Sequence, residues 1–300
     1  MPPDPLAVRL APHRAISNLR FGMVWAAVMV VVLDVWFHLG GVLASPDLAG
    51  WFDAASEHGL GSWLSVTQTA LVALTLWAVA AVVRRSGAPR GRVAGWVVLA
   101  AFVTYLALDD GTRLHERVGA AFSDSAASER GLGAAFPSYS WQLVLGPAFA
   151  GMGLFMAVFL WREFRGGGLW RWVGGAFALL ATAVTLDFVD GLPGGHPLDL
   201  IGQVGTLATV EDWAAAWSDR TGFSTVLHLS RIVEESLEMV AMTLLWTAFL
   251  THLTRLVPGV VLTWDDEAEP TGERAAAHSR VLRSDLGRWL ESTAPERAEA

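Results

Sequence analysis

The stretch Trp141–Trp161 reads WQLVLGPAFAGMGLFMAVFLW and contains no charged residue. A helix needs about 20 predominantly apolar residues to cross the hydrocarbon core of a bilayer. The tryptophan at each end is typical of the membrane–water interface, where amphipathic rings are favoured. This stretch by itself predicts a membrane-spanning helix.

Five further stretches have the same character: Phe21–Leu43, Trp63–Val83, Val93–Leu108, Trp170–Val189 and Ile232–Leu253. Hydrophobic residues make up 53% of the 300 residues, charged residues 17%, and the mean hydropathy is +0.42. A soluble domain of this size cannot bury so much apolar surface. We therefore predict an all-α polytopic membrane protein, a bundle of six transmembrane helices. The third span is short and can continue through Asp109 toward His115. Because glycine disfavours the helix interior, Gly111 leaves the last residue of this helix undecided.

The distribution of arginine predicts the orientation of the bundle. Arginines precede the first span and occupy the loops after spans two and four, whereas the loop after the first span is acidic and has none. The positive-inside rule then places both termini in the cytoplasm, N-in/C-in, in a bacterial cytoplasmic membrane. These arginines are Arg9, Arg14, Arg20, Arg84, Arg85, Arg90, Arg92, Arg162, Arg165 and Arg171.

We divide the chain into a cytoplasmic N-terminal segment (1–20), a six-helix transmembrane domain (21–257) and a polar cytoplasmic tail (258–300). Apolar residues recur in the tail at helical spacing, which fits a short amphipathic helix on the inner leaflet, and a solvated tail fits equally well. Val42-Leu43-Ala44 resembles a signal-peptidase site, but the long apolar run before it is interrupted by Asp34 and His38, which favours an uncleaved anchor. The apolar tail residues are Val281, Leu282, Leu286, Trp289 and Leu290.

Composition restricts the partners of the chain. The absence of cysteine excludes disulfides and thiolate metal sites. The net charge of −8, with no basic cluster, argues against nucleic acid. The expected partners are the lipid bilayer and a lipid or small-molecule substrate, and the oligomeric state is left open.

Ionisable side chains gather at the predicted outer face of the spans. An aspartate at the centre of a membrane helix costs roughly 2.5–3.5 kcal/mol, and less toward the interface. Several helices that carry acids at one depth therefore need partners, protons or a metal in compensation. We expect one polar cavity that opens outward. Its predicted members are Asp34, His38, Ser65, Thr67, Gln68, Asp109, Asp110, His115, Glu116, Asp187, Asp190, Glu234, Glu235 and Glu238.

Carboxylates with one or two imidazoles and no thiolate suit a hard or borderline divalent cation, such as zinc, iron or manganese. Glu235 and Glu238, with Ser65, are predicted catalytic residues, a glutamate acting as general base toward a metal-activated water. Glu235-x-x-Glu238 has the three-residue spacing of di-iron carboxylate motifs, which Asp110 and His115 do not match. The predicted metal ligands are Asp34, His38, Asp109, Asp110, His115 and Glu116.

Plainer interpretations stay open for part of this set. Arg231 precedes Glu234 by three residues, a spacing typical of an ordinary helix salt bridge. Three acids are interpreted as solvated at helix ends: Asp110, Glu116 and Asp190. Two histidines are interpreted as surface residues in the loop before span six: His196 and His228.

Two motifs resemble those of a family of uncharacterised bacterial multipass membrane proteins. They are Tyr105-Leu-Ala-Leu-Asp-Asp-Gly-Thr-Arg-Leu-His-Glu116 and Glu234-Glu-Ser-Leu-Glu-Met239. Members read Ser-Leu-Asp-Glu followed by His-Glu, and Glu-Glu-x-Leu-Glu-Met in the last helix. The Trp63-Leu-Ser65 stretch is similar to the Trp-Phe-Ser that opens their second helix.

The resemblance covers roughly residues 20–255 and implies a shared architecture and a shared acidic–histidine site, without a known reaction. This chain departs from the pattern at Asp110, which replaces the usual glutamate, and at Ala107, which replaces the usual serine. A more distant analogy links it to alkaline ceramidase-like membrane hydrolases, which hold zinc among helices through histidines, an aspartate and a serine. Their paired-histidine motif is missing from the last helix here, so the analogy implies a reaction class alone.

Three functions fit these observations. The first is a membrane-embedded metal-dependent hydrolase, or a related enzyme, that acts on a lipid or small molecule. The second is a proton- or cation-coupled transporter that uses the same acids, for which sites near the midplane and broken helices are expected. The third is a structural or sensory membrane protein whose tail contacts a cytoplasmic partner.

Overall fold

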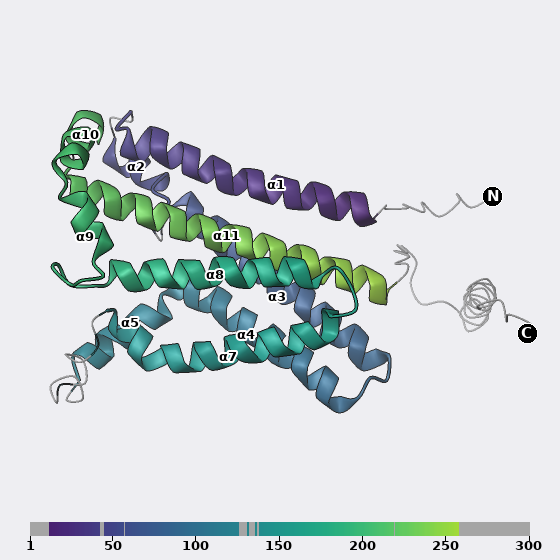
Figure 1. Cartoon of the computed structure of the whole chain (residues 1–300). Coiled ribbons are helices and arrows are strands. Elements are labelled where there is room, and N and C mark those ends of the chain that lie inside the picture. Colours follow the sequence, from purple (N-terminus) through teal and green to yellow (C-terminus); the bar gives the residue numbers. More distant parts are fainter. Residues whose placement is uncertain are drawn as a thin grey trace, which may run out of the picture. The chain divides into compact units, whose positions relative to one another are not determined.

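The computed structural model describes residues 12–42, 45–56, 58–125, 131, 136, 138–218 and 220–257 of the chain (Figure 1). All regular structure within these residues is helical. The predicted polar tail and its amphipathic helix (258–300), and residues 1–11 of the predicted N-terminal segment, lie outside them.

Six helices are long and apolar enough to cross a membrane, which confirms the predicted number of spans by length and composition. The first consists of α1 (Pro12–Leu33) and the π-helix η1 (Asp34–Leu39). The others are α3 (Leu60–Arg85), α4 (Arg90–Thr112), α7 (Ser140–Phe164), α8 (Trp170–Asp190) and α11 (Gly222–Leu256). Shorter helices lie between them: α2 (Pro46–Trp51), α5 (Leu114–Ser123), α9 (Leu200–Gly205) and α10 (Ala208–Ser218).

Helix α11 is the central element, because it packs against α1, α3 and α8, while α4 packs on α3 and α5 on α7. Figure 1 shows α11 running between α1 and α8. The starts of α1 and α8 lie at the C-terminal end of α11, and η1, α9 and α10 lie at its N-terminal end. Residues far apart in the sequence therefore meet at each end of α11.

The apolar core lies between α3, α4, α7, α8 and α11. Trp96, Leu160 and Phe249 are completely buried within it, and the Trp96 ring meets the Phe249 ring edge-on. Large apolar side chains also cover the outside of the helices: Trp63, Leu154 and Phe21 are 69%, 67% and 66% exposed. Soluble monomers rarely expose such continuous apolar surface, so this outer surface is typical of contact with lipid.

Several helix boundaries differ from the predicted spans, and two of them position polar residues. Helix α4 continues past Gly111 to Thr112, and Arg113, at φ 54°, then reverses the chain into α5. Helix α11 begins at Gly222, well before the predicted start at Ile232, with the Thr221 hydroxyl accepting a hydrogen bond from the Ser224 amide. The first turns of α11 bury the polar Thr225 and His228, so a criterion of continuous hydropathy does not detect them.

Candidate functional site

The last part of the first span is a π-helix, η1, which carries both Asp34 and His38. Single π turns inside longer helices are rare and frequent at functional sites. Asp34 is fully buried, although it lies at the end of an apolar span. A buried carboxylate in such a place needs a partner from another element.

Helix α11 supplies that partner through His228. The Nε2 atom of His228 lies 3.1 Å from Asp34 Oδ1 and 3.0 Å from Oδ2. His228 is itself buried, at 8% exposure. The interpretation of His228 as a surface histidine in a loop is therefore wrong, because the residue belongs to α11 and faces α1.

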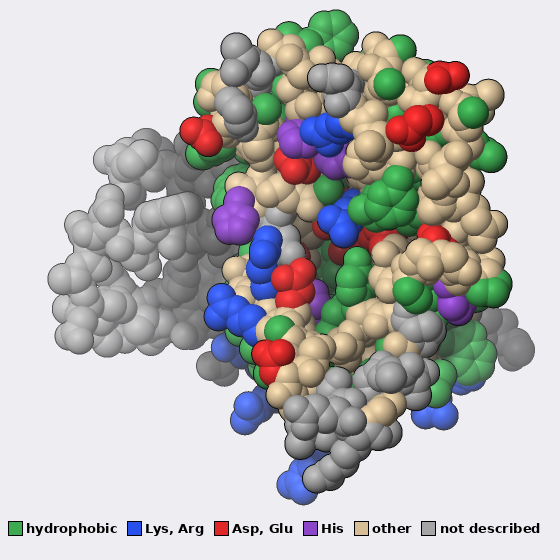
Figure 2. Space-filling model, turned by 90° about the vertical axis from the view of Figure 1, so that its left-hand side faces the viewer, with side chains coloured by type: hydrophobic (Ala, Val, Ile, Leu, Met, Phe, Trp, Pro, Cys, Tyr) green, Lys and Arg blue, Asp and Glu red, His purple; other side chains and the backbone are tan. Residues whose placement is uncertain are grey.

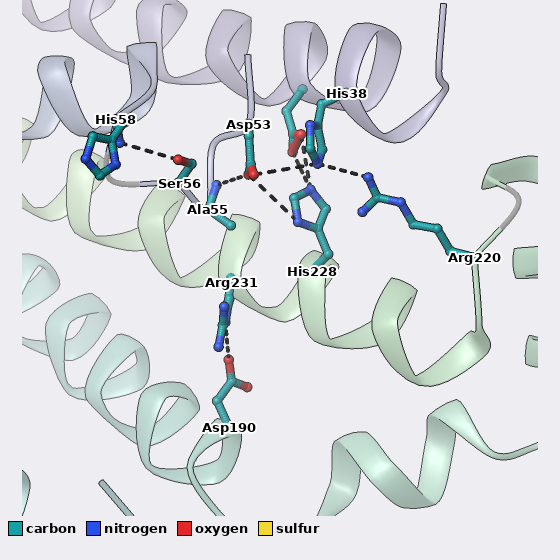
Figure 3. Close-up of polar contacts among 10 residues, drawn as sticks. His38, Asp53, Ala55, Ser56, His58, Asp190, Arg220, His228 and Arg231 are labelled. Carbon is teal, nitrogen blue, oxygen red and sulfur yellow. Dashed lines mark hydrogen bonds and ion pairs between the residues drawn. The ribbon is translucent and has the colours of Figure 1, made fainter. Parts of the chain in front are cut away.

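The chain after α2 adds a second carboxylate, that of Asp53. One of its oxygens, Oδ1, accepts a hydrogen bond from the Ala55 amide at 3.0 Å, which fixes the side chain. Its Oδ2 lies 3.6 Å from His38 Nε2, and its Oδ1 lies 3.9 Å from His228 Nδ1. Figure 3 shows these three side chains turned toward one another.

Asp34, His38, Asp53 and His228, which we call the His–Asp cluster, can hold a metal ion. One donor atom from each residue lies within 4.8 Å of the donor atoms of the other three. Ligands at about 2.1 Å from a tetrahedral zinc lie about 3.4 Å apart, and Asp53 lies at slightly longer distances, 3.6 and 3.9 Å, from the nitrogens of the two imidazoles.

Arg220 reaches the same cluster and places its Nη2 atom 3.0 Å from His38 Nε2. Arginine is always a donor, so His38 Nε2 is the acceptor and its proton resides on Nδ1. That Nδ1 atom is buried and has no hydrogen-bond partner among the described atoms. The His38 lone pair thus points at Arg220, and a metal ion must displace the guanidinium to reach it.

A second group of polar residues begins at the junction of α4 and α5. The buried Asp109 accepts a hydrogen bond from the His115 amide at 2.8 Å, and its Oδ2 lies 3.0 Å from His115 Nδ1. The left-handed Arg113 makes this approach possible by turning α5 back toward α4. Asp109 therefore satisfies an amide at the start of α5 and orients the imidazole.

The predicted catalytic residues lie beside this junction. The Ser65 hydroxyl of α3 contacts the Asp110 carboxyl, whose charge also interacts with those of Glu235 and Glu238 on α11. Glu238 further interacts with Asp187 of α8. Four spanning helices therefore bring carboxyl groups or a hydroxyl to one place.

Two acids of α8 extend this group. Asp187 Oδ2 accepts a hydrogen bond from Gln142 Nε2 at 2.8 Å, and Asp190 Oδ1 accepts one from the Ser230 hydroxyl at 3.0 Å. Arg231 Nε lies 3.6 Å from Asp190 Oδ2, so Arg231 pairs with α8. We call the whole group the acidic network: Ser65, Asp109, Asp110, His115, Asp187, Asp190, Glu234, Glu235 and Glu238.

Glu116 lies at the edge of this group, where its charge interacts with that of Asp187. It is exposed, and its Oε2 lies 3.9 Å from Arg113 Nη1. This weak ion pair on the surface agrees with the interpretation of Glu116 as a solvated acid at a helix end.

The structure thus divides the predicted ligands and catalytic residues between two groups, whereas the predicted Gln68 donates a hydrogen bond to the Thr243 hydroxyl and Thr67 joins neither group. Asp34 and His38 belong to the His–Asp cluster, and the remaining predicted ligands except Glu116 join the predicted catalytic residues in the acidic network. The reason is α11, which lies between α1 and α8 and turns His228 to one side and Arg231 to the other (Figures 1 and 3). Figure 2 shows this end of the molecule, where acidic, basic and histidine side chains gather toward the middle.

Sequence reasoning missed two members of the His–Asp cluster, Asp53 and His228. A signal for His228 is present, because Thr221 and Ser224 form an N-cap that starts α11 early enough to include it. His228 then precedes Glu235 by two helical turns. Asp53 lies between short elements and has no comparable pattern around it.

One protein family matches the chain. Its model, described as a domain of unknown function (DUF8692), matches residues 23–253, which include both the His–Asp cluster and the acidic network. No curated protein and no solved structure matches the chain.

Proposed function

We propose that this chain, which belongs to the family described as a domain of unknown function (DUF8692), is a membrane-embedded metal-dependent hydrolase. The observation that carries the proposal is the convergence of Asp34, His38, Asp53 and His228 from η1, the chain after α2, and α11. Two imidazoles and one carboxylate, with a second carboxylate behind one imidazole, form a ligand set for zinc, iron or manganese.

A divalent metal held there supplies a Lewis acid that polarises a substrate oxygen or a water molecule. Asp34 is the buried member that orients His228, as carboxylates do behind metal-bound imidazoles. Asp53 is the more exposed carboxylate, at 21% against 0% for Asp34. We assign Asp53, with His38 and His228, the role of metal ligand, which would leave a fourth position for water or substrate.

The surroundings of the cluster favour a lipid or another amphipathic substrate. Trp36 of η1 and Trp51 of α2 are each 62% exposed. Tryptophan side chains prefer the headgroup region of a bilayer. A cluster flanked by them lies at the depth where the ester, amide or phosphoester bonds of a lipid are found.

Metal analysis of the purified full-length protein tests this proposal. We expect about one zinc, iron or manganese ion per chain, and its loss in His228→Ala. The control is His58→Ala, which removes an exposed imidazole near the same loop (Figure 3). A wild-type protein with no more metal than His228→Ala after metal loading contradicts the proposal.

The proposed orientation places both termini in the cytoplasm, so that the His–Asp cluster faces outward. Because the chain has no cysteine, a single introduced thiol reports on its own side of the membrane. In intact cells, Gly194→Cys, in the loop after α8, should react with an impermeant maleimide, and Ser86→Cys, after α3, should react once the cells are opened. The reverse pattern contradicts this orientation.

A second candidate function, proton- or cation-coupled transport, is favoured by the acidic network. Its carboxyl groups lie in α4, α8 and α11, all candidate membrane spans. Ionisable groups in such segments often mark ion pathways. Proton uptake into proteoliposomes that Glu238→Gln abolishes, with the metal content unchanged, favours transport over hydrolysis.

A further inference from the structure

A cavity of about 350 Å³ lies at the opposite end of α11 from the His–Asp cluster. It is lined by the start of α1, the start of α8 with the glycines before it, and the last turns of α11. None of the residues that line it takes part in the proposed hydrolysis. The cavity therefore needs an explanation of its own.

Two arginines converge on the glycine run that precedes α8. A Cβ atom at Gly167 would lie 3.3 Å from Arg255 Nη1, and one at Gly168 would lie 3.7 Å from Arg171 Nη2. The guanidinium groups thus lie over two consecutive residues without side chains. Gly168, Arg171 and Arg255 all line the cavity.

A third arginine comes from α1. Arg20 lies over the ring of Trp172, with Cζ 4.6 Å from the ring centroid, and both residues line the cavity. The ring holds the guanidinium in place without neutralising its charge. Three separate helices therefore direct fixed positive charges at one space.

The described residues that line the cavity include neither aspartate nor glutamate. The nearby Glu163 lines the adjoining smaller cavity and is held by Arg92, with Nη2 and Oε2 2.8 Å apart. The lining is therefore positively charged, and the forked donors of a guanidinium group match the oxygens of a phosphate.

Two further features lie beside these arginines. Helix α8 begins at Trp170 without a side-chain cap, and the Leu169 carbonyl accepts hydrogen bonds from the Trp172 and Val173 amides. In the adjoining cavity of about 190 Å³, which shares Leu169 and Arg255 with the first, His252 is buried and its Nε2 atom has no described partner.

We propose that this cavity binds the phosphate of an anionic phospholipid from the leaflet that surrounds the starts of α1 and α8. Arg171 and Arg255 contact the phosphate, and Arg20 holds the side of the headgroup nearest α1. The exposed Phe21, which follows Arg20, offers an apolar surface for an acyl chain. Basic pockets between spanning helices recognise anionic headgroups in this way.

Native mass spectrometry of the delipidated full-length protein tests this site with two added lipids of identical acyl chains, phosphatidylglycerol and phosphatidylcholine. We expect selective retention of phosphatidylglycerol, weakened about 30-fold in Arg171→Gln/Arg255→Gln, since each arginine at an anionic surface contributes about 1 kcal/mol. The matched control is Arg84→Gln/Arg85→Gln, which removes two exposed arginines at the end of α3 and should leave retention unchanged.

Equal retention of the two lipids, or unchanged retention in the Arg171→Gln/Arg255→Gln protein, overturns the proposal. Thermal unfolding with inorganic phosphate alone separates the two sources of the anion. Stabilisation by phosphate without any by phosphatidylglycerol assigns the cavity to a soluble anion and overturns the lipid assignment. Because these residues lie outside the His–Asp cluster, the metal content is expected to stay unchanged in both variants.

Discussion

The His–Asp cluster and the acidic network lie on two sides of one helix and satisfy their charges in different ways. In the His–Asp cluster each carboxylate faces an imidazole, and Arg220 adds a positive charge. In the acidic network the carboxyl groups of Glu235, Glu238 and Asp110 face one another. The first group is close to charge balance, whereas the second has an excess of acid.

This difference teaches how a membrane bundle accommodates ionisable groups. Imidazoles paired with carboxylates at short distances can together bind one cation. Removal of one member of such a pair leaves the other buried without a partner. Carboxyl groups that neighbour only other carboxyl groups bind protons or cations, because their negative charges repel one another. Neutralisation of one of them weakens this repulsion. The two groups should therefore respond oppositely to substitution.

The largest expected effect is on the Asp34–His228 pair. Asp34→Leu should lower the free energy of unfolding by about 3–5 kcal/mol, because it leaves His228 buried without a partner. Chemical denaturation in detergent measures this change. Asp34→Leu/His228→Leu should recover part of the loss, and a double variant as unstable as the sum of the single variants contradicts the pairing.

Arg220→Ala should strengthen metal binding by about tenfold, because the guanidinium no longer competes for His38 Nε2. Titration of the metal-free protein with zinc, followed by calorimetry, measures the affinity. Arg255→Ala, at the other end of α11, is the control and should leave the affinity unchanged. Weaker binding in Arg220→Ala shows instead that Arg220 supports the cluster.

The direction in which Glu238→Gln changes the free energy of unfolding tests the acidic network. Removal of one charge among neighbouring carboxyl groups should raise the free energy of unfolding by about 1 kcal/mol at neutral pH. Asp34→Asn, in the His–Asp cluster, should lower it under the same conditions. A loss of stability in both variants means that the acidic network holds a cation of its own.

The smallest effect concerns Tyr139, which adjoins the acidic network through Arg231. Burial raises the pKa of the Tyr139 phenol above its ordinary value, and Arg231 opposes this rise. The folded state then keeps the phenol proton to higher pH than the unfolded state, so the stabilisation is complete below about pH 10 and is lost as the pH rises further.

Thermal unfolding between about pH 9 and 11 measures the Tyr139 contribution. Tyr139→Phe should lose less stability over this range than the wild type does, by less than about 1 kcal/mol. Identical slopes for the two proteins contradict the buried position of the phenol.

Much of the bundle could be predicted because each span is a local feature. The uncharged run Trp141–Trp161 lies within α7, and the predicted span that begins at Trp170 ends one residue before α8 does. The early start of α11 could not be predicted from hydropathy, because the buried residues of its first turns include the polar Thr225 and His228.

The sequence by itself determined that six apolar helices form and that acids and histidines collect at one end of them, because hydropathy and helical spacing are properties of neighbouring residues. The tertiary structure alone decided which of these residues meet. Asp34 lies 194 positions before His228, and Asp53 has no pattern of its own, so their meeting depends on how α11 packs against α1. Packing sets the rotation of each helix about its axis, and that rotation separates the His–Asp cluster from the acidic network.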